Sequence, residues 1–411
     1  MYTMRQEAEK IIYAAIQQSM PETAVRRALA DFALQGNAYV VSVGKAAWRM
    51  AKSAHEILGE HIRKGVIITK YGYSEGPLEG FKIFEAGHPI PDQNGVEATE
   101  YALSLVKNLK EEDVVVFLLS GGGSALFEKP NVELEELGEV TQQLLTCGAN
   151  IVEINAIRKR LSAVKGGRFA QRCAPAKVYS VVLSDVIGDR MDMIASGPCC
   201  VDSSTCEDAL AICERYGLRL SDRARDLIQV ETPKEIRNVH NVVEGSVRQL
   251  CMAAKREAKA LGYQPILLTT SMTCVAREAG DFLASIAREH AAGKERIAYI
   301  SGGETVVRVR GSGKGGRNQE LALSAAIGMQ GIENALLFSV GSDGTDGPTD
   351  AAGGYADGGS VVRMRSGGID PVVALENNDA YPALRTSGDL ILTGPTGTNV
   401  NDLTVLLIGG R

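Results

Sequence analysis

A glycine-rich loop with three carboxylates is the part of this sequence whose residue types best suit metal and phosphate chemistry. The segment 339–354 reads SVGSDGTDGPTDAAGG and follows an apolar run typical of a buried strand. It contains Asp343, Asp346 and Asp350, which repel one another unless a cation compensates them. Mg²⁺ commonly takes one or two carboxylates together with phosphate oxygens. We therefore predict Asp343 and Asp346 as metal ligands and Asp350 as a brace of the loop, with a solvated acidic turn as the alternative.

A lysine lies where a predicted strand turns into a predicted helix. The segment AYVVSVGKAAWRMAK places Gly44 and Lys45 at this turn. A cation at a helix N-terminus is unfavourable by about 0.3 to 1 kcal/mol, and a bound anion would offset that cost. Gly44 and Lys45 are therefore candidates to bind an anionic ligand, and an exposed lysine that tolerates the cost is the alternative.

A second glycine-rich loop follows the apolar run VVVFLL. Consecutive glycines allow backbone N–H groups to approach an anion closely. The loop is not a Walker A motif, because the string GxxxxGK followed by Ser or Thr does not occur in the chain. A tight turn without a ligand is the alternative. The candidate phosphate contacts are Ser120, Gly121, Gly122, Gly123 and Ser124.

Acidic residues follow a third apolar run in the segment VVLSDVIGDRMDMIASGP. Asp185, Asp189 and Asp192 lie there, so acids again follow a predicted strand, as they do after residue 340. A ligand role for Asp185 or Asp189 and a helix-capping role are both open on this pattern.

The segment RGSGKGGRNQELAL matches GxGxxG through Gly311, Gly313 and Gly316. One interpretation is the dinucleotide fingerprint of dehydrogenases, but the preceding TVVRVR alternates valine with arginine where that fingerprint expects an apolar strand. The other interpretation is a basic loop that clamps phosphate, with Arg317 presenting its planar fork to phosphoryl oxygens. A solvated glycine-rich loop is the third. The candidate binding residues here are Gly313, Lys314, Gly315, Gly316, Asn318 and Glu320.

Three further polar residues have simple local explanations. His88 precedes a proline and is expected to be a turn residue. Asn399 and Asp402 in TGPTGTNVNDL are expected to stabilise the backbone of their own loop.

The composition narrows the class of protein. A chain of 411 residues usually forms two domains, and a net charge of -6 provides no basic surface for nucleic acid. The eight cysteines lack metal-ligand spacings, so we expect reduced thiols. A charged N-terminus and the lack of an apolar run of about 20 residues predict a cytoplasmic protein without a signal peptide or membrane span.

Short apolar runs alternate with amphipathic stretches, which predicts parallel sheets covered by helices. The first 35 residues are expected to form two helices, the second beginning at Pro21. The polar stretch 221–237 places the domain boundary between residues 230 and 231. The second, mixed sheet would then use NVHNVVEG, QPILLTT, RIAYISGGE, TVVRVR, DLILTGP and LTVLLIGG.

Taken together, SVGKAA, LLSGGGSAL, LSDVIGD, IASGP, GKGGRNQELAL, GSDGTDGPTDAAGG and TGPTGTNVNDL resemble the class II glycerate kinases, whose C-terminal part is the MOFRL domain. The resemblance spans nearly the whole chain. It implies an α/β fold of two domains, an N-terminal Rossmann-like domain with a parallel sheet and a C-terminal MOFRL-like domain with a mixed sheet. It also implies an active site in the cleft between them.

The resemblance implies ATP- and Mg²⁺-dependent phosphorylation of D-glycerate, most often at the 2-hydroxyl. Lys45 and Arg317 would bind the transferring phosphoryl group or the glycerate carboxylate. Asp343 with Asp346 would bind Mg²⁺, and Asp189 or Asp346 would orient the acceptor hydroxyl. The expected partners are glycerate and a nucleotide, with no nucleic acid and no membrane, and a homodimer is left open.

Three alternatives remain at this point. They are phosphorylation at the 3-hydroxyl, an NAD(P)H-dependent hydroxypyruvate reductase, and a nucleotide sensor without catalysis. The reductase is motivated by GxGxxG and by a name that members of the family have also been given.

Overall fold

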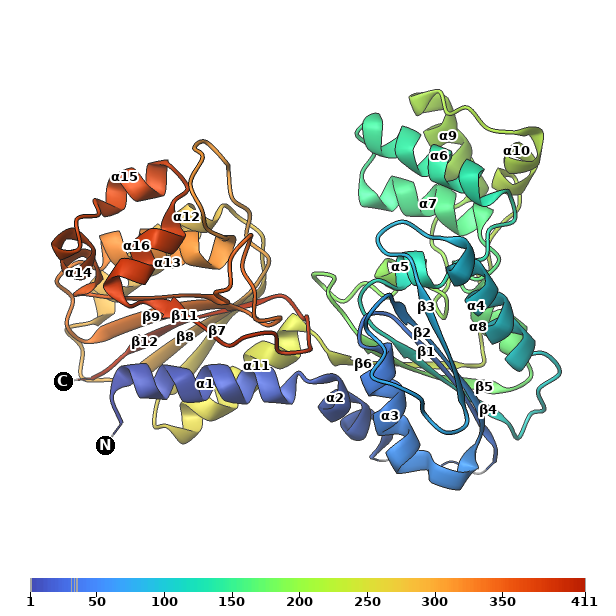
Figure 1. Ribbon diagram of the computed structural model, residues 1–411, viewed down its shortest axis with the longest axis horizontal. Coiled ribbons are helices and arrows are strands. Elements are labelled where there is room, and N and C mark those ends of the chain that lie inside the picture. Colours follow the sequence, from blue (N-terminus) through green and yellow to red (C-terminus); the bar gives the residue numbers. More distant parts are fainter. Residues whose placement is uncertain (1, 31, 33, 35, 411) are drawn as a thin grey trace. The chain divides into compact units, whose positions relative to one another are not determined.

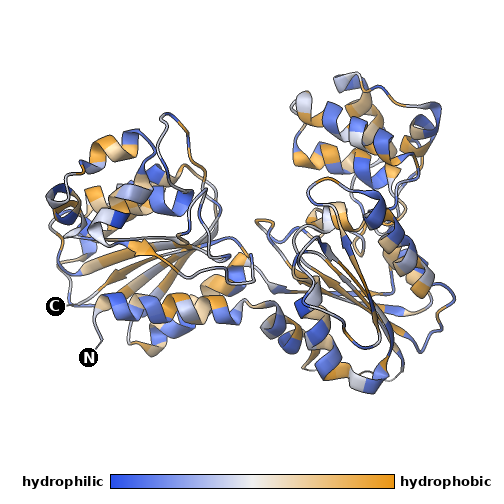
Figure 2. Cartoon of the chain, viewed as in Figure 1, coloured by the Kyte–Doolittle hydropathy of each residue, from blue (hydrophilic) through white to orange (hydrophobic). Residues whose placement is uncertain are grey.

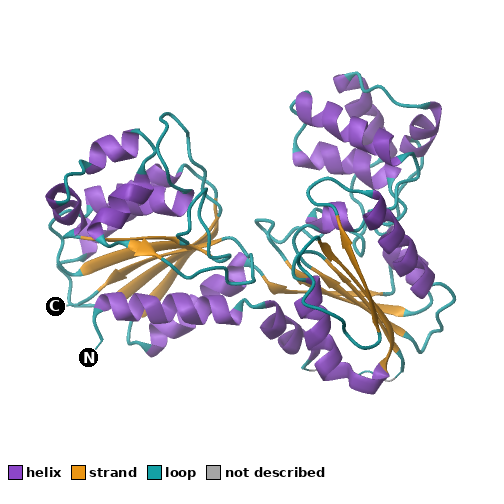
Figure 3. Ribbon diagram, in the orientation of Figure 1, coloured by secondary structure: helices purple, strands orange, loops and turns teal. Residues whose placement is uncertain are grey.

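The computed structural model describes residues 2–30, 32, 34 and 36–410. The chain forms two compact units, each built from a sheet with helices (Figure 1, Figure 3). The N-terminal unit is Pro21–Glu244, and the C-terminal unit combines Met1–Met20 with Gly245–Arg411. The predicted α/β class and the two domains are confirmed.

The sheet of the N-terminal unit has six strands in the order β3-β2-β1-β4-β5-β6. The four pairings that join β3, β2, β1, β4 and β5 are all parallel. This order is that of the Rossmann fold, as predicted. The strands are β1 (Ala38–Val43), β2 (Ile62–Lys70), β3 (Phe81–Ala86), β4 (Val114–Leu119), β5 (Lys177–Leu183) and β6 (Val239–Gly245).

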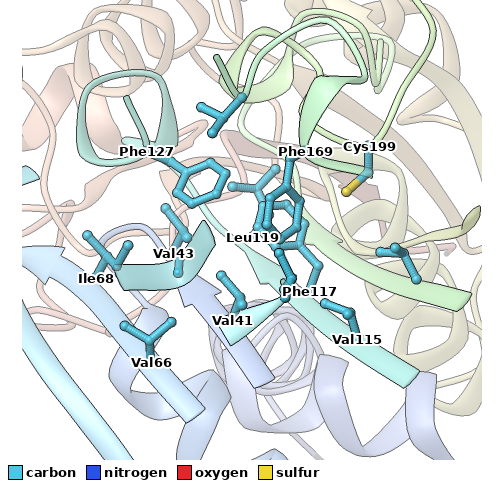
Figure 4. Packing of buried hydrophobic residues seen from close by; sticks show 14 of the residues in the cluster. Val41, Val43, Val66, Ile68, Val115, Phe117, Leu119, Phe127, Phe169 and Cys199 are labelled. Carbon is cyan, nitrogen blue, oxygen red and sulfur yellow. The ribbon is translucent and has the colours of Figure 1, made fainter. Parts of the chain in front are cut away.

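The central strands are buried because their side chains are apolar on both faces (Figure 2). On one face, Phe117 of β4 packs against Phe127 and Phe169, with ring centroids 5.5 and 4.9 Å away (Figure 4). Phe117 lies in β4 and Phe127 lies just after the loop that follows β4, so their packing holds both ends of that loop.

Helices cover the parallel sheet, and α6, α7, α9 and α10 gather into a separate helical group with its own apolar core (Figure 1). The helices of this unit are α2 (Pro21–Leu29), α3 (Ala47–Leu58), α4 (Gln93–Leu105), α5 (Gly123–Leu126), α6 (Leu134–Thr146), α7 (Ile151–Leu161), α8 (Arg168–Cys173), α9 (Cys206–Tyr216) and α10 (Asp222–Ile228), with short 3-10 turns η1 (Gly59–His61) and η2 (Ile194–Ser196).

The sheet of the C-terminal unit is mixed, with the order β11-β10-β9-β12-β8-β7. Only β7 and β8 pair in parallel among these six strands, and the other pairings are antiparallel. The predicted mixed sheet is confirmed. The strands are β7 (Gln264–Met272), β8 (Ile297–Gly303), β9 (Ala335–Gly341), β10 (Gly353–Asp357), β11 (Leu390–Ile391) and β12 (Asp402–Ile408).

Two layers of helices enclose this mixed sheet (Figure 1). On one face lie α1 (Met4–Gln18) and α11 (Val247–Ala260), and on the other lie α12 (Ala276–His290), α13 (Arg317–Gly328), α14 (Ser360–Ser366), α15 (Pro371–Glu376) and α16 (Ala380–Ser387).

The division of the chain differs from the predicted boundary at residues 230 and 231. Helix α1 belongs to the C-terminal unit, where Glu7 accepts hydrogen bonds from Tyr263 at 2.5 Å and from Arg296 at 2.6 Å. The segment NVHNVVEG, expected in the second sheet, forms β6 beside β5 in the first. The polar stretch around residue 230 therefore lies within the N-terminal unit and does not link the two units.

Two expected strands of the second sheet are also corrected. TVVRVR forms no strand, and its one ladder contact is an isolated bridge between Val275 and Val306. DLILTGP contributes only Leu390–Ile391. The prediction that a second helix begins at Pro21 is confirmed, with Glu22 in its first turn.

The structure bears on the expected lack of a membrane span and on the expected reduced thiols. No helix in the described ranges combines the length and apolar character needed to cross a membrane. The eight cysteines are free thiols in the structure.

Candidate active site

Two of the predicted loops meet at the point where the strand order of the N-terminal sheet reverses, between β1 and β4. Ligands of open α/β sheets bind outside the carboxyl ends of the strands at such a point. Lys45 follows β1, and its backbone N–H donates to Gly121 O at 2.9 Å. The N–H of Ala46 donates to Ser120 Oγ at 3.1 Å. The structure thus joins the lysine turn to the SGGGS loop by backbone and side-chain hydrogen bonds.

Charged side chains converge on the glycines of this loop. A Cβ at Gly121 would lie 2.5 Å from Oδ2 of Asp185 and 3.7 Å from Cε of Lys45. A Cβ at Gly122 would lie 3.1 Å from Cδ2 of His88, and the φ of Gly122 is +93°, a conformation that favours glycine. Glycine is favoured at 121 by the close approach of Asp185 and at 122 by that of His88 and by the positive φ, while Lys45 lies at ordinary contact distance.

The electrostatics of this cluster favour an anionic ligand. Burial lowers the pKa of His88, and the ammonium groups of Lys45 and Lys70 lower it further, while Asp185 acts in the opposite direction. His88 is therefore a neutral imidazole near neutral pH. Lys70 ends β2 and Lys45 follows β1, so both cations come from the carboxyl edge of the parallel sheet.

The remaining acids of VVLSDVIGDRMD differ from Asp185 in position. Asp192 pairs with its neighbour Arg190 at 2.7 Å and has no need of a ligand. Asp189 has a φ of +51°, and its buried Oδ1 has no hydrogen-bond partner among the described residues. Such strain at a polar residue is common beside functional sites. Asp185 Oδ2 is the atom nearest to the Cβ position of Gly121.

The C-terminal unit holds Arg317 in a bidentate clamp. Its Nε donates to Asp402 Oδ2 at 2.5 Å and its Nη2 donates to Asp402 Oδ1 at 3.1 Å. Its Nη1 lies 3.2 Å from Glu304 Oε1. Arg317 begins α13, Asp402 begins β12 and Glu304 follows β8, so three elements fix the direction of the guanidinium.

Sequence reasoning missed Glu304 and gave Asp402 only a local role. Asp402 is 85 positions from Arg317 in the sequence, and no spacing rule connects the two. The usable signal was that both acids adjoin apolar strands, as Asp343 does.

Burial alone would lower the pKa of Arg317, but the hydrogen bonds and charge of Asp402 raise it above its ordinary value. Burial raises the pKa of the Asp402 carboxyl, although its bonds to Arg317 act against this. The Arg317 side chain is 34% exposed, so part of it remains accessible to a ligand.

Asp346 occupies the N-terminus of α13. Its Oδ1 accepts from Asn318 N at 3.2 Å and its Oδ2 accepts from Gln319 N at 2.9 Å. A Cβ at Gly316 would lie 2.2 Å from Asp346 Cγ, so only glycine fits there. Burial raises the pKa of Asp346 to about 7, although these N–H donors act against it. Both oxygens accept from helix amides, which gives Asp346 a capping role beside the metal and catalytic roles predicted for it.

The capping role of Asp346 predicts a loss of stability when its side chain is removed. In Asp346→Ala, two amides of a buried helix start lose their acceptors, and we expect the free energy of unfolding to fall by about 1 to 2 kcal/mol. Urea unfolding followed by circular dichroism measures this. The exposed Asp350 is the control, and Asp350→Ala, which removes one exposed hydrogen bond to Tyr381, should lower the free energy of unfolding by less than about 0.5 kcal/mol. Equal midpoints for both variants would contradict the capping role.

The amides of the predicted phosphate loop are largely used by the protein itself. The N–H groups of Arg310 and Gly311 donate to Asn378 Oδ1 at 2.7 and 3.0 Å. The N–H of Lys314 donates to Asp379 Oδ1 at 2.8 Å. A Cβ at Gly313 would lie 2.5 Å from Asn377 O, so this glycine serves close backbone packing. Within the predicted cradle, the amides of Gly313 and Lys314 are thus used inside the protein. Residues 304–316 form no strand, so no strand leads directly into the loop as a dinucleotide fingerprint requires.

The other predicted contacts in this segment are also internal. Asn318 Oδ1 accepts from Ser339 Oγ at 2.6 Å, and Glu320 Oε2 accepts from Asn378 Nδ2 at 2.8 Å. Both side chains are buried. Lys314 is exposed, with Nζ 4.7 Å from the centre of the Tyr381 ring. Of the predicted residues here, Arg317 and Lys314 retain a charge that faces outward.

The acidic loop offers carboxylate oxygens at the end of β9. A Cβ at Gly341 would lie 3.3 Å from Asp343 Oδ1 and 3.5 Å from Asp402 Oδ1, so these two acids gather there. Asp350 instead accepts from Tyr381 Oη at 2.7 Å and braces the loop, the part expected of it. Within the described residues no set of three or more His, Cys, Asp or Glu side chains is arranged to hold a metal ion. One or two carboxylates still fit Mg²⁺, which keeps most of its other positions for water and phosphate.

Two protein families and several known proteins match the parts of the chain that carry these motifs. Residues 7–229 match the family described as a domain of unknown function (DUF4147), and residues 297–402 match the MOFRL family. A protein of Thermotoga maritima named D-glycerate 2-kinase is 54% identical, over 99% of each chain. One of Pyrococcus horikoshii named glycerate 2-kinase is 41% identical, over 93% of this chain and 89% of the relative.

A crystal structure of a Thermotoga maritima glycerate kinase superposes with a TM-score of 0.96 at 54% identity. The superposition covers 98% of this chain and 99% of the other. Sequence and fold agree along almost the entire length, and the chain belongs to the glycerate 2-kinase family.

Proposed function

We propose that this protein transfers the γ-phosphoryl group of ATP to the 2-hydroxyl of D-glycerate in the presence of Mg²⁺. The observation that carries the proposal is the joined cluster of Lys45, Gly121 and Asp185 at the reversal of the parallel sheet. A relative that is 54% identical over 99% of both chains bears the name of this activity. A cationic cluster with one carboxylate suits an acid substrate whose hydroxyl must be deprotonated.

In the N-terminal unit, we assign anion binding to Lys45 and orientation of the acceptor hydroxyl to Asp185. Phosphoryl transfer requires mainly the alignment of acceptor and phosphate and the neutralisation of spreading negative charge. Lys45 supplies a positive charge beside the SGGGS loop. Asp185 approaches the same glycine from the end of β5 and can accept the proton of a hydroxyl held there. Asp185 replaces Asp346 in this role, because the oxygens of Asp346 are bound to helix amides.

In the C-terminal unit, we assign phosphoryl oxygens to Arg317. Asp402 and Glu304 fix the direction of the planar guanidinium, and Nη1 and Nη2 each keep a further N–H for phosphate oxygens. Asp343 would hold Mg²⁺, which when bound neutralises charge on phosphate oxygens.

The hydroxypyruvate reductase is disfavoured by specific contacts. A dinucleotide needs a free helix N-terminus for its pyrophosphate. Asp346 occupies that position on α13, and Asn377, Asn378 and Asp379 occupy the loop amides before it.

The product made from D-glycerate tests the proposal. We expect ³¹P NMR to show 2-phosphoglycerate and ADP in equal amounts when ATP and Mg²⁺ are supplied. Formation of 3-phosphoglycerate would show that the phosphoryl group goes to the 3-hydroxyl instead of the 2-hydroxyl. Oxidation of NADH by hydroxypyruvate without ATP would overturn the kinase.

A substitution of Asp343 tests the metal assignment. Asp343→Asn keeps the size of the side chain and removes its charge, so we expect the Mg²⁺ concentration for half-maximal activity to rise roughly tenfold. Asp350→Asn on the same loop is the control and should leave the titration unchanged. Identical Mg²⁺ titrations for Asp343→Asn and the wild type would remove Asp343 from the metal site.

A further inference from the structure

A buried ion pair lies beneath the SGGGS loop of the N-terminal unit. Nζ of Lys165 is 3.3 Å from Oε2 of Glu128, and both side chains are completely buried. The same ammonium donates to the backbone carbonyls of Ser124 at 2.9 Å and Phe127 at 3.1 Å. None of the functions assigned above uses this pair.

The carbonyl of Ser124 receives a second cationic donor. Nη2 of Arg158, on α7, donates to Ser124 O at 2.9 Å. Ser124 and Phe127 lie within and just after α5, the short helix that follows Gly121 and Gly122. The Phe127 ring also packs in the aromatic cluster (Figure 4). The segment from Ser124 to Phe127 is therefore held by hydrogen bonds to its carbonyls and by packing of its aromatic ring.

This ion pair is a weak source of stability. Removing two charges from water costs about as much as their attraction returns. Both oxygens of Glu128 lack a hydrogen-bond partner among the described residues, so hydrogen bonds do not offset the cost of burying its charge. What the pair provides is an ammonium group in a fixed place, aimed at two backbone carbonyls.

The loop fixed in this way is the one that contacts the charged cluster. Gly121 approaches Asp185 and Lys45, and Gly122 approaches His88. We propose that Lys165, held as an ammonium by Glu128, is a positioning residue that sets the shape of the Gly121 to Ser124 backbone and so the alignment of Lys45 and Asp185. The kinetic part of this inference rests on the proposed glycerate kinase function.

Titration of Lys165 gives the arrangement an expected pH dependence. Burial lowers the pKa of Lys165 to about 8, with Glu128 acting to raise it and Arg158 acting to lower it further. The ammonium is therefore present below about pH 8 and is lost as the pH rises through that value. Neutral Lys165 binds the carbonyls of Ser124 and Phe127 more weakly, so the loop should loosen in the same range.

A double substitution removes the pair without leaving one buried charge alone. In Lys165→Met/Glu128→Gln, we expect a thermal midpoint close to that of the wild type, because exchange of a whole buried pair is often neutral. We expect kcat/KM for D-glycerate to fall about 100-fold, the usual effect of a misplaced catalytic group. The decline of activity above about pH 8 in the wild type should be absent from the variant.

The control is a buried network in the same unit, in which Asp202 pairs with Lys159 and also lies 3.6 Å from Nη1 of buried Arg160. Nζ of Lys159 is 3.0 Å from Oδ1 of Asp202, with 4% and 0% of the side chains exposed. Lys159→Met/Asp202→Asn should lower activity only in proportion to any loss of folded protein. An equal effect of both double variants on kcat/KM, or a retained decline above pH 8 in the Lys165 variant, would overturn the positioning role.

Hydrogen exchange of the wild-type protein tests the same inference without substrate. Amides in the peptide spanning residues 121–127 should lose protection between pH 7 and pH 9 after correction for intrinsic rates. Unchanged protection would overturn the inference even in an active kinase. Lost protection in a protein that makes no ADP from ATP and D-glycerate would instead count against the proposed function alone.

Discussion

Replacing Arg317 with alanine is expected to lower kcat for glycerate phosphorylation by about 10³-fold, as for arginines that stabilise charge in phosphoryl transfer. The side chain is held by Asp402 through two hydrogen bonds and by Glu304 through a third contact, yet a third of it is exposed. A guanidinium fixed this firmly can meet developing charge without reorganising. A coupled assay of ADP release at saturating ATP and glycerate measures the effect.

Two variants separate charge from geometry in this experiment. Arg317→Lys keeps the charge but loses the planar fork, so it should recover only a small part of the activity. Arg310→Ala removes an exposed arginine from the same loop and should stay within about threefold of the wild type, as surface substitutions usually do. If folded Arg317→Ala turned over at a similar rate to Arg310→Ala, Arg317 would have no role in catalysis.

The elements that position both clusters could be predicted from local patterns. The apolar runs AYVVSV, VVVFLL and ALLFSV each became a buried strand, because continuous apolar sequence suits a strand covered on both faces. The alternation in TVVRVR did not, although it looks like a half-exposed strand. A strand also needs a neighbour for its ladder, and local sequence does not show which edge is available.

The partners of charged side chains were harder to predict because they are distant in the sequence. Asp346 caps a helix that begins 29 positions earlier, at Arg317, and Asp402 clamps the same arginine from the last strand. An acid after a strand is equally suited to metal binding, capping or ion pairing, and only the fold decides among them. Lys165 gave no signal at all, since a lysine in a polar stretch is usually exposed.

The glycines show the same limit. Gly121 and Gly313 both follow the pattern of an anion-binding loop in the sequence. In the structure Gly121 makes room for the carboxylate of Asp185, whereas Gly313 makes room for the backbone of Asn377. A missing side chain indicates close approach, and the identity of what approaches decides the function.

Replacing Lys45 with methionine is expected to lower kcat/KM for D-glycerate by about 10²- to 10³-fold, the range for a single charged or polar group lost from a reacting site. Methionine keeps the length and apolar stem of lysine and removes its charge. The backbone bond from residue 45 to Gly121 O is made by the main chain, so the loop keeps its tie and the protein should remain folded. Steady-state rates with varied glycerate and ATP separate the effects on kcat and KM.

The helix that follows Lys45 supplies the control for this variant. Lys52 lies on α3 and is exposed, with Nζ 5.5 Å from the centre of the Trp48 ring, and Lys52→Met removes an equal charge from the same unit. If the effect of Lys45→Met arose from overall charge, both variants would lose activity equally and added salt would reduce the difference from the wild type. If Lys45 binds the reacting anion, Lys52→Met should stay within about threefold of the wild type. If folded Lys45→Met had the kcat/KM of the wild type, Lys45 would not bind the reacting anion.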